Sequence, residues 1–579
     1  MSTYDKFPVI EIEGKTGYEG WDAVAEALNK TIDRIAKNRK IIVLECYQGV
    51  NDNEIRSQLQ NKIPHSIWVE SAAAFKPEDE IKKMAYPDVT DDAIFGFMTR
   101  LNMQDFFDAG KLTDKKNDVD AASGTIVVYG PGASLVAENF DLLVYFDMAR
   151  WEIQLRMRRN EVNNLGVQNK NEAANLQYKQ GFFVDWRVCD RLKKKLFHQI
   201  GFLVDTNQPG NPKMVSGADL LYALEQTAQR PFRVMPFFDP GPWGGQWMKE
   251  VCNLDRSEEN FAWAFDCVPE ENSLLLGFGG VVVEIPSVNL VFLQPEKLLG
   301  PKVYSRFGDE FPIRFDLLDT WDGGNLSLQV HPLTEYVQEK FGMRYTQEES
   351  YYYLDAKEGS VIYLGFKEGV NKDEMIHELN EAQKGNLEFE TEKYVNAFPA
   401  KKHDHMAIPP GTIHCSGANS VVLEISATPY IFTFKLWDWG RMGLDGKPRP
   451  INIEHGKNVL QWNRDTNWVK EHALNLVKKV DEGDGYVEES TGLNEREFIE
   501  TRRHWFTKKV LHHTHNNLNV LNLVEGDAVV VESPENNFAP FTVHYAETFI
   551  VPAFVGAYTI RPLKEDGRTY GTIKAYVRG

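Results

Sequence analysis

The pattern of apolar residues changes near residue 230, and this change constrains the fold more than any other feature of the chain. Before it, apolar runs such as KIIVLECY (40–47) alternate with helical stretches such as GWDAVAEALNKTIDRIAKN (20–38). Strands that alternate with helices are typical of a parallel sheet built from βαβ units. After it, short segments such as GNLSLQVHP (324–332) and GSVIYLGF (359–366) are separated by turns, as in an all-β barrel or sandwich. The 579 residues are therefore predicted to form a multidomain protein, with an α/β part first and all-β parts after it.

The charge balance and the cysteines exclude several classes of protein. The formal net charge is −20, from 84 acidic and 64 basic residues, which disfavours nucleic acid or an anionic membrane as a partner because both are polyanions. Five cysteines are scattered without a Cys-x-x-Cys pair, which indicates reduced thiols in an intracellular protein. The chain begins without a basic segment and apolar core, and no run of about 18 apolar residues occurs. We therefore expect a cytoplasmic protein with no signal peptide and no membrane-spanning helix.

Four polar residues in the β-rich part form a candidate metal site. In NLSLQVHP (325–332), Gln329 and His331 are two residues apart, so on a strand their side chains point to the same face. Glu349 begins a later strand, ESYYYLDA, and His414 follows the turn PPGT in IPPGTIHC. A single histidine in a barrel is more often a hydrogen-bonded core residue. An amide, a carboxylate and two imidazoles together, however, suit zinc or another divalent ion with one position left open.

The segments that carry these residues resemble type I mannose-6-phosphate isomerase, a zinc-dependent enzyme of the cupin fold. The resemblance covers roughly residues 232–579 and rests on LSLQVHP, EESYYYLDAKEGSVIYLGFK, AIPPGTIHCSGANSVVLEIS, FFDPGPWGGQWM (237–248) and FKLWDWGRMGLDGKPRPINIEHGKNVL (434–460). It implies a metal-binding cupin domain at 231–460, with a small helical insertion at 373–386, and a second cupin barrel at 461–579. It also implies one Zn²⁺ per chain in the first barrel, bound by Gln329, His331, Glu349 and His414.

The resemblance further implies a reaction, the interconversion of mannose 6-phosphate and fructose 6-phosphate, with a small sugar phosphate as the binding partner. Such an isomerisation moves a proton between C1 and C2 through an enediol, and it requires a Lewis acid, a base and cations for the phosphate. The implied catalytic residues are Lys435, Glu349 and Arg441. The implied phosphate-binding residues are Arg314, Lys435, Arg441 and Arg449, and Lys447 lies in the same basic loop.

Three positions depart from the family pattern. Gln347 stands where the family has a lysine two residues before the glutamate ligand, Asp316 where it has a lysine before the QVHP strand, and Lys435 where it has an arginine. Lysine and arginine hold a phosphate differently, so these changes leave a second interpretation open, a non-catalytic metal-binding sensor of sugar phosphates. In the second barrel, LHHTHNN (511–517) and His544 could ligate a metal, but a surface loop is the favoured interpretation.

The first 230 residues resemble a different family, the P-loop nucleoside and pantothenate kinases. DLLVYFDMARWEIQLRMRR (141–159) is predicted to be a strand that ends in Asp, followed by a basic helix whose lid arginines would be Arg150, Arg156, Arg158 and Arg159. After KIIVLE, however, the chain reads CYQGVNDNEI and lacks GxxxxGK[ST], so Mg-ATP has neither its lysine nor its hydroxyl ligand. A degenerate kinase-like α/β domain at 1–230, without phosphotransfer, is therefore predicted, with a structural, dimer-forming or ligand-sensing role. A bifunctional protein with an active kinase domain remains open, as does a homo-oligomer.

Overall fold

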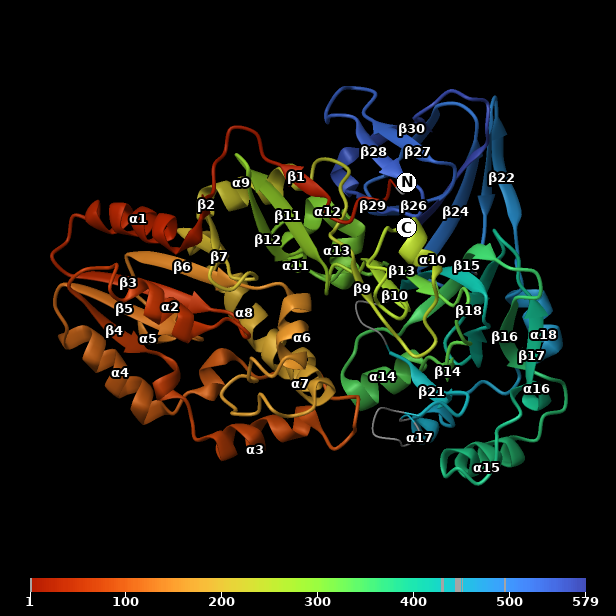
Figure 1. Ribbon diagram of the computed structural model, residues 1–579, viewed down its shortest axis with the longest axis horizontal. Helices are drawn as coiled ribbons and strands as arrows, with labels where there is room; N and C mark the ends of the chain where they lie inside the picture. The colour runs from red at the N-terminus through yellow and green to blue at the C-terminus, as the bar shows by residue number, and fades with distance from the viewer. Residues whose placement is uncertain (1–2, 428–431, 443–448, 450, 494–495, 579) are drawn as a thin grey trace.

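The computed structural model describes the chain except for residues 1–2, 428–431, 443–448, 450, 494–495 and 579. Its described strands form six sheets. Figure 1 shows an α/β region on one side of the molecule and two β-rich regions, one above the other, on the opposite side. The protein is thus multidomain and rich in sheet, as the sequence predicted.

A seven-stranded sheet with the order β2-β8-β7-β6-β3-β5-β4 forms the centre of the α/β region. Its parallel strands are β3 (Lys40–Cys46), β4 (Ser66–Glu70), β5 (Thr125–Gly130), β6 (Leu142–Asp147) and β7 (Phe202–Asp205). The antiparallel strands β8 (Lys213–Ser216) and β2 (Tyr18–Glu19) extend it. β3 and β6 are buried along nearly their whole length, because helices cover both faces of a parallel sheet. The parallel sheet is as predicted, whereas the kinase-like character of this region stays a prediction.

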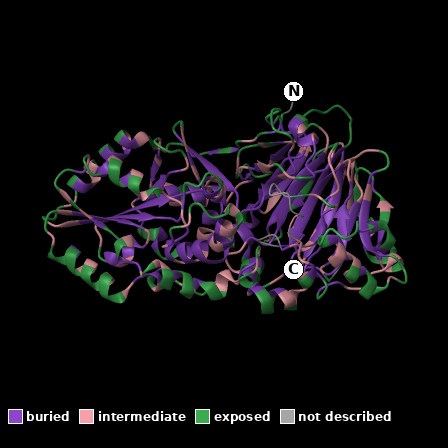
Figure 2. Ribbon diagram, turned by 60° about the horizontal axis from the view of Figure 1, so that its bottom comes forward, coloured by how far each residue is buried: buried purple, intermediate pink, exposed green. Residues whose placement is uncertain are grey.

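The helices of this region connect its strands and bury one face each. In α1, Trp21, Val24, Leu28 and Ile32 recur at helical spacing and pack in one core with the sheet. Figure 2 shows the same division along the region, with buried sheet and partly exposed helices. No helix among the described residues has the length and apolar character needed to cross a bilayer. The helices are α1 (Gly20–Asp33), α2 (Asp52–Leu59), α3 (Glu78–Val89), α4 (Ala109–Ala121), α5 (Ala133–Val136), α6 (Arg150–Arg158), α7 (Ala174–Gln180), α8 (Trp186–Leu196) and α9 (Gly217–Thr227).

A small sheet and the segment before it connect the α/β region with the rest of the chain. β1 (Val9–Glu11) pairs in parallel with β11 (Ser273–Phe278), which pairs with β12 (Val281–Pro286), and the helices α11 (Val288–Leu293), α12 (Pro295–Leu299) and α13 (Pro301–Phe307) follow. The hydroxyl of Tyr4 donates to Asp266, 262 residues away, at 2.6 Å. The backbone N–H of Asp5 donates to Glu547, 542 residues away, at 2.6 Å. The segment 4–11 therefore contacts both β-rich regions, because Asp266 belongs to one of them and Glu547 to the other.

The first β region consists of two facing sheets, with the orders β18-β15-β20-β13-β10-β9 and β17-β16-β19-β14-β21. Inward side chains of both sheets belong to one core, as in a sandwich or barrel. The predicted helical insertion is α15 (Lys372–Gln383), which lies at the edge of this region in Figure 1. The strands are β9 (Phe237–Asp239), β10 (Trp263–Cys267), β13 (Arg314–Asp319), β14 (Leu328–Val330), β15 (Glu348–Ala356), β16 (Val361–Phe366), β17 (Val395–Pro399), β18 (His405–Ile408), β19 (His414–Ser416), β20 (Ser420–Ala427) and β21 (Phe434–Trp437).

The second β region has the same plan, with sheet orders β22-β23-β24-β31-β26-β29 and β25-β30-β27-β28. Phe506 and Tyr570 of the first sheet share a core with Tyr558 of the second. The charged stretch 477–490 forms most of the hairpin β22–β23, which extends the first sheet with exposed side chains on β22. The strands are β22 (Lys478–Gly483), β23 (Tyr486–Ser490), β24 (Ile499–Phe506), β25 (Val510–His513), β26 (Asn519–Glu525), β27 (Ala528–Glu532), β28 (Phe541–His544), β29 (Thr548–Val551), β30 (Ala557–Pro562) and β31 (Tyr570–Val577).

Candidate metal centre and ligand cavities

Three segments bring the four predicted metal ligands together in the interior of the first β region. Gln329 on β14 lies directly opposite His414 on β19, so both side chains point to the same face. His331 follows β14, and Glu349 lies near the start of β15 in the facing sheet. Oε1 of Glu349 is 2.9 Å from Nε2 of His331 and 2.7 Å from Nε2 of His414. Within the described residues, these three are the one group of His, Cys, Asp or Glu side chains close enough to share a metal ion.

The hydrogen bonds of the two imidazoles show that this cluster needs a positive charge. Nδ1 of His331 lies 2.8 Å from the carbonyl of Phe432, and Nδ1 of His414 lies 2.9 Å from the carbonyl of Thr412. A carbonyl only accepts, so each Nδ1 carries a proton, and each Nε2 of a neutral ring presents a lone pair to Glu349. The lone pairs of the two Nε2 atoms would repel the carboxylate oxygen of Glu349. Additional protons on the rings or a bound cation must therefore lie between these atoms. Burial raises the pKa of Glu349, but the two histidines outweigh burial and hold that pKa well below its usual value.

The donor set fits a divalent cation such as zinc. His331, Glu349 and His414 have side chains that are at most 1% exposed, and nitrogen and oxygen donors without thiolate are typical of catalytic zinc. Ligand atoms around an ion with bonds of about 2.0–2.1 Å lie roughly 3.3 Å apart, so the contacts of Glu349 would lengthen by about half an ångström. Nε2 of Gln329 lies 3.3 Å from Nε2 of His414, and turning the amide by 180° brings Oε1 to this position.

Gln347, which departs from the family pattern, supports the ligand Glu349. Its Nε2 donates to Oε2 of Glu349 at 2.8 Å and to Oε1 of Glu424 at 3.1 Å, and its Oε1 accepts from the backbone N–H of Phe432 at 2.9 Å. An amide does not titrate, so Gln347 orients the carboxylate and carries no proton for a reaction. Burial, and then the charge of Glu349, raises the pKa of Glu424 well above its usual value, which favours the protonated acid.

Three cationic side chains lie beside the metal cluster. Lys435 on β21 is directly opposite Gln329, so its side chain points into the same interior. Burial, and then the charge of Arg449, lowers the pKa of Lys435 to about 8, so its amine is mostly protonated at pH 7. Arg441 and Arg449 both bind the carboxylate of Asp438, at 2.5 and 2.9 Å. The two arginines thus share one carboxylate, and with Lys435 close by the group has a net positive charge.

Arg314, the fourth predicted phosphate ligand, already has an acidic partner. Its guanidinium forms an ion pair with Asp316 and lies 3.9 Å from Glu424. The side chain is 2% exposed, and turning it toward a phosphate would leave the carboxylate of Asp316 buried and unpaired. Arg314 is therefore a buried ion-pair residue of β13, and it does not belong to the group of cations around Lys435. Lys447 lies outside the described residues.

Two acidic residues of this site were missed by sequence reasoning. Asp438 forms ion pairs with both Arg441 and Arg449, and its carboxylate also accepts a hydrogen bond from the hydroxyl of Ser327 at 2.6 Å. Its place between Lys435 and Arg441 in KLWDWGR was an available signal, because one acid among several bases is a common ion-pair centre. Glu424 had no clear local signal, because its partner Gln347 comes from another segment and only the hydroxyl of Ser426, two residues on, is local.

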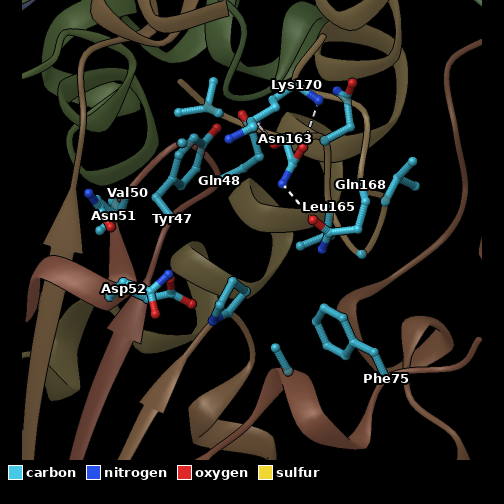
Figure 3. Close-up of a pocket in the computed structure, with 18 of the residues that line it drawn as sticks. Tyr47, Gln48, Val50, Asn51, Asp52, Phe75, Asn163, Leu165, Gln168 and Lys170 are labelled. Carbon is cyan, nitrogen blue, oxygen red and sulfur yellow. Dashed lines mark hydrogen bonds between the residues drawn. The ribbon is translucent and has the colours of Figure 1, made fainter. Parts of the chain in front are cut away.

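A second cavity lies in the α/β region, at the carboxyl ends of the parallel strands. Its volume is about 1010 Å³, and it is lined mainly by residues within 47–54, 70–76 and 160–170, together with Lys111, Pro131, Arg156 and Pro209. Figure 3 shows Asn51 and Asp52 on one side of this cavity, and Phe75 and Gln168 on the other. Open α/β sheets bind ligands at this edge, so the cavity is where a nucleotide would be expected.

The start of α2, however, is capped and acidic. Oδ1 of Asn51 accepts from the backbone N–H of Glu54 at 3.1 Å, and the carboxylates of Asp52, Glu54 and Glu70 line this part of the cavity. Amides at the start of a helix can bind phosphate, but three carboxylates beside them repel an anion. Burial, and then the carboxylate of Glu70, raises the pKa of Asp52, so this part of the cavity is already rich in acidic groups.

The four arginines expected to act as lid residues also have acidic partners. Arg150 has a side chain that is 1% exposed, and it lies between Asp190 and Glu270. The other pairs are Arg156 with Glu152, Arg158 with Asp239, and Arg159 with Glu152 and Glu161. Each of the four arginines therefore already has a carboxylate partner. None of them is an unpaired cation that could bind a transferred phosphate.

Comparison with known proteins gives different results for the two halves of the chain. Residues 20–229 match a protein family described as a domain of unknown function (DUF8485). The chain is also 26% identical over 227 residues to the mannose-6-phosphate isomerase of Streptococcus mutans serotype c, which covers 39% of this chain and 66% of that enzyme. It is 25% identical over 154 residues to mannose-6-phosphate isomerase ManA of Bacillus subtilis, which covers 27% of this chain and 45% of that enzyme.

The chain thus spans roughly half to two-thirds of the length of these curated relatives. Among solved structures, mannose 6-phosphate isomerase from Bacillus subtilis aligns with 60% of this chain and 100% of its own, at 18% sequence identity and a TM-score of 0.48. The relatives of this chain are therefore mannose-6-phosphate isomerases, at low sequence identity.

Proposed function

We propose that the protein is a zinc-dependent aldose–ketose isomerase that interconverts mannose 6-phosphate and fructose 6-phosphate. The observation that carries this proposal is the cluster of His331, Glu349 and His414, which fits a divalent cation. Lys435 lies beside this cluster, opposite Gln329, and Arg441 and Arg449 pair with Asp438 on the same side of the region. A metal centre next to fixed cations suits a substrate with a carbonyl at one end and a phosphate at the other. The isomerases to which the chain is similar support the choice of sugar.

The proposed division of labour follows from the positions of the residues. When bound, the metal ion polarises the carbonyl of the sugar and so makes the neighbouring C–H more acidic. Glu349, His331 and His414 hold the ion, with Gln329 as the fourth ligand, and Gln347 keeps the carboxylate of Glu349 oriented.

The cationic group is proposed to hold the phosphate of the sugar. Lys435 points into the interior next to Gln329, and Arg441 and Arg449 lie around Asp438. Charge-assisted hydrogen bonds from lysine and arginine are stronger than neutral ones, and two arginines can contact several phosphate oxygens at once. Arg314 is left out of this group because Asp316 already occupies its guanidinium.

The test is turnover of mannose 6-phosphate by the purified full chain, together with its metal content. We expect fructose 6-phosphate to form, a chelator to stop the reaction, and zinc to restore it. Bound zinc and bound sugar phosphate without turnover would contradict the isomerase and favour the sensor. A protein that binds no metal would overturn the site assignment itself.

For the α/β region we propose a role without phosphotransfer. Support comes from the start of α2, where Asn51 caps the helix and Asp52, Glu54 and Glu70 supply carboxylates, and from the arginines of α6, which already pair with carboxylates. The full chain should therefore neither hydrolyse ATP nor phosphorylate mannose. Mg-ATP turnover that persists after removal of the first β region's metal would contradict this proposal.

A further inference from the structure

We propose that the second β region binds a small phosphorylated molecule in a basic cavity at one end of its interior, separate from the metal centre. The cavity has a volume of about 470 Å³, within the size range of small-molecule sites. Arg502, His504, His512 and Lys574 line it. None of these residues takes part in the proposed isomerase site.

Strand geometry shows that the cavity lies on the inward face of the region. Along β24, Arg502 and His504 share a face with Phe506, which packs in the core of the second β region. On the neighbouring strand β31, Lys574 lies directly opposite Arg502, so these two cationic side chains point the same way. The cavity is therefore the polar end of the same interior whose other end is apolar.

The motif LHHTHNN contributes His512, His513 and His515 to the lining of the cavity, but of these only His512 is buried in the interior. His512 is buried and stacks on Tyr558 with ring centroids 5.2 Å apart, whereas its neighbour His513 is exposed, because successive side chains on β25 point to opposite faces. The sequence favoured a surface loop for LHHTHNN. This agrees with the exposure of His513 but not with His512, which is buried on β25. His512 also lies against His504, with ring centroids 4.5 Å apart.

Several polar groups of the cavity are buried without a partner. Nδ1 of His504 and Nε2 of His512 make no hydrogen bond, although these residues are only 3% and 4% exposed. Lys574 is 8% exposed, its amine lies 5.8 Å from the ring of Tyr576, and no ion pair of this amine is found among the described residues. Burying polar or charged groups without partners costs free energy, and a ligand that pairs with them would recover it.

The charge of the lining selects an anion. Among the described residues of the lining, Lys302, Arg502 and Lys574 are basic and Glu488 is acidic, in a chain whose net charge is −20. Arg502 also pairs with Glu500, but Nε and Nη1 of its guanidinium make no hydrogen bond. Burial, and then the neighbouring His504 and Lys574, lowers the pKa of His512. A concave positive site on an otherwise acidic protein concentrates small anions.

A metal ion is the weaker alternative for the same residues. Glu488 lies 3.5 Å from Nε2 of His504, but no third ligand of the required kind is close enough to both within the described part of the chain. The ammonium of Lys574 would also repel a cation. A phosphate, by contrast, can accept from an ammonium, a guanidinium and imidazole N–H groups at the same time.

The test is a calorimetric titration of the full chain with inorganic phosphate. Lys435→Met removes a cation from the proposed site in the first β region, and it is the background in which the second site is measured. In this background we expect one phosphate per chain, with an affinity that falls at least about tenfold when Lys574→Met is added. Lys508→Met is the matched control, because Lys508 is an exposed lysine of the same region that pairs with Asp484, and it should leave the affinity unchanged.

A second readout separates a binding role from a structural one. Without phosphate, Lys574→Met should unfold at the same or a higher temperature than the background, because it removes a buried unpaired charge. Phosphate should raise the unfolding temperature of the background but not of this variant. A lower unfolding temperature with unchanged phosphate affinity would overturn the proposal, as would loss of all phosphate binding in Lys435→Met alone.

Two further ligands identify the source of the phosphate. Tighter binding of mannose 6-phosphate than of inorganic phosphate would assign a phosphorylated sugar, and weaker binding would assign free phosphate. Mannose itself should not bind in the Lys435→Met background at millimolar concentration, and if it does, the phosphate is not the group recognised. These binding measurements need no turnover, so they remain valid even if the protein has no isomerase activity.

Discussion

The two β regions have the same plan and differ in the polar groups that occupy the centre of each interior. In the first, the carboxylate of Glu349 lies in the centre, and two imidazole nitrogens face it at 2.7 and 2.9 Å. In the second, Lys574 and Arg502 lie on neighbouring strands, and Glu488 is the one carboxylate of the lining. The first arrangement is completed by a cation and the second by an anion.

This difference teaches how one architecture serves two ligands. Facing sheets supply an enclosed interior, and alternation along each strand decides which few side chains enter it. Exchanging an acid for a base at such a position reverses the charge of the interior without altering the strands. Each variant below tests whether the two interiors differ in the way described, and the largest expected effect comes first.

The strongest test removes a metal ligand. His414→Ala should lose bound zinc and more than about 1,000-fold of the isomerase activity, because the polarising ion is lost. The exposed His377 provides the control, and His377→Ala should keep both metal and activity. Metal analysis and a coupled assay measure the two quantities. Full activity in a metal-free His414→Ala protein would show that the first interior is not a metal centre.

The second test concerns the cation beside the metal. Lys435→Met should raise KM for mannose 6-phosphate roughly 10- to 100-fold, because a charge-assisted hydrogen bond to the phosphate is lost. kcat should change little, and the exposed Lys457, which pairs with Glu454, gives the control variant Lys457→Met. Steady-state kinetics separate the two constants. A fall in kcat at constant KM would assign Lys435 to the chemical step instead.

The third test concerns the residue that orients Glu349. Gln347→Leu removes the hydrogen bonds to Glu349 and Glu424 and should weaken zinc binding about 10- to 100-fold, the range typical of residues that support a metal ligand. Competition with a chromogenic chelator measures the zinc affinity. An unchanged affinity would mean that Glu349 is held by the fold alone.

The smallest effect is a pH dependence confined to the second interior. Burial lowers the pKa of Lys574 to about 8, while Glu488 and Glu500 raise it and Arg502 lowers it further. The amine is protonated below this pKa, so phosphate affinity should fall several-fold as the pH rises from 7 to 9. Lys574→Arg keeps its charge over this range and should show a flat profile in the same titration. Equal slopes for the two proteins would exclude Lys574 as the source of the charge.

The first interior was predictable from sequence because its ligands lie in short, patterned segments. The spacing of Gln329 and His331 fixes their common face, and Glu349 and His414 each stand at the end of a strand beside a turn. The phosphate-binding role of Arg314 stays a prediction. Its ion pair with Asp316 could have been expected, because Asp316 stands two residues away on the same strand and therefore on the same face.

The second interior could not be predicted in the same way. LHHTHNN suggested a cluster of three histidines, yet strand alternation turns His512 inward and His513 outward. Lys574 lies in a segment without a recognisable motif. It comes to lie opposite Arg502 only through the pairing of β31 with β24. Pairing between strands 70 residues apart in sequence depends on the whole sheet, and no local pattern reports it.

The segment 4–11 has a consequence for the order in which the protein can fold. Its hydrogen-bond partners include Asp266 and Glu547, and β1 pairs with β11. Synthesis on the ribosome proceeds from the N-terminus, so β1 stays unpaired until about half of the chain has emerged, and Asp5 meets Glu547 only when nearly the whole chain has been made. The first strand made can therefore pair only after all strands of the seven-stranded α/β sheet have been synthesised.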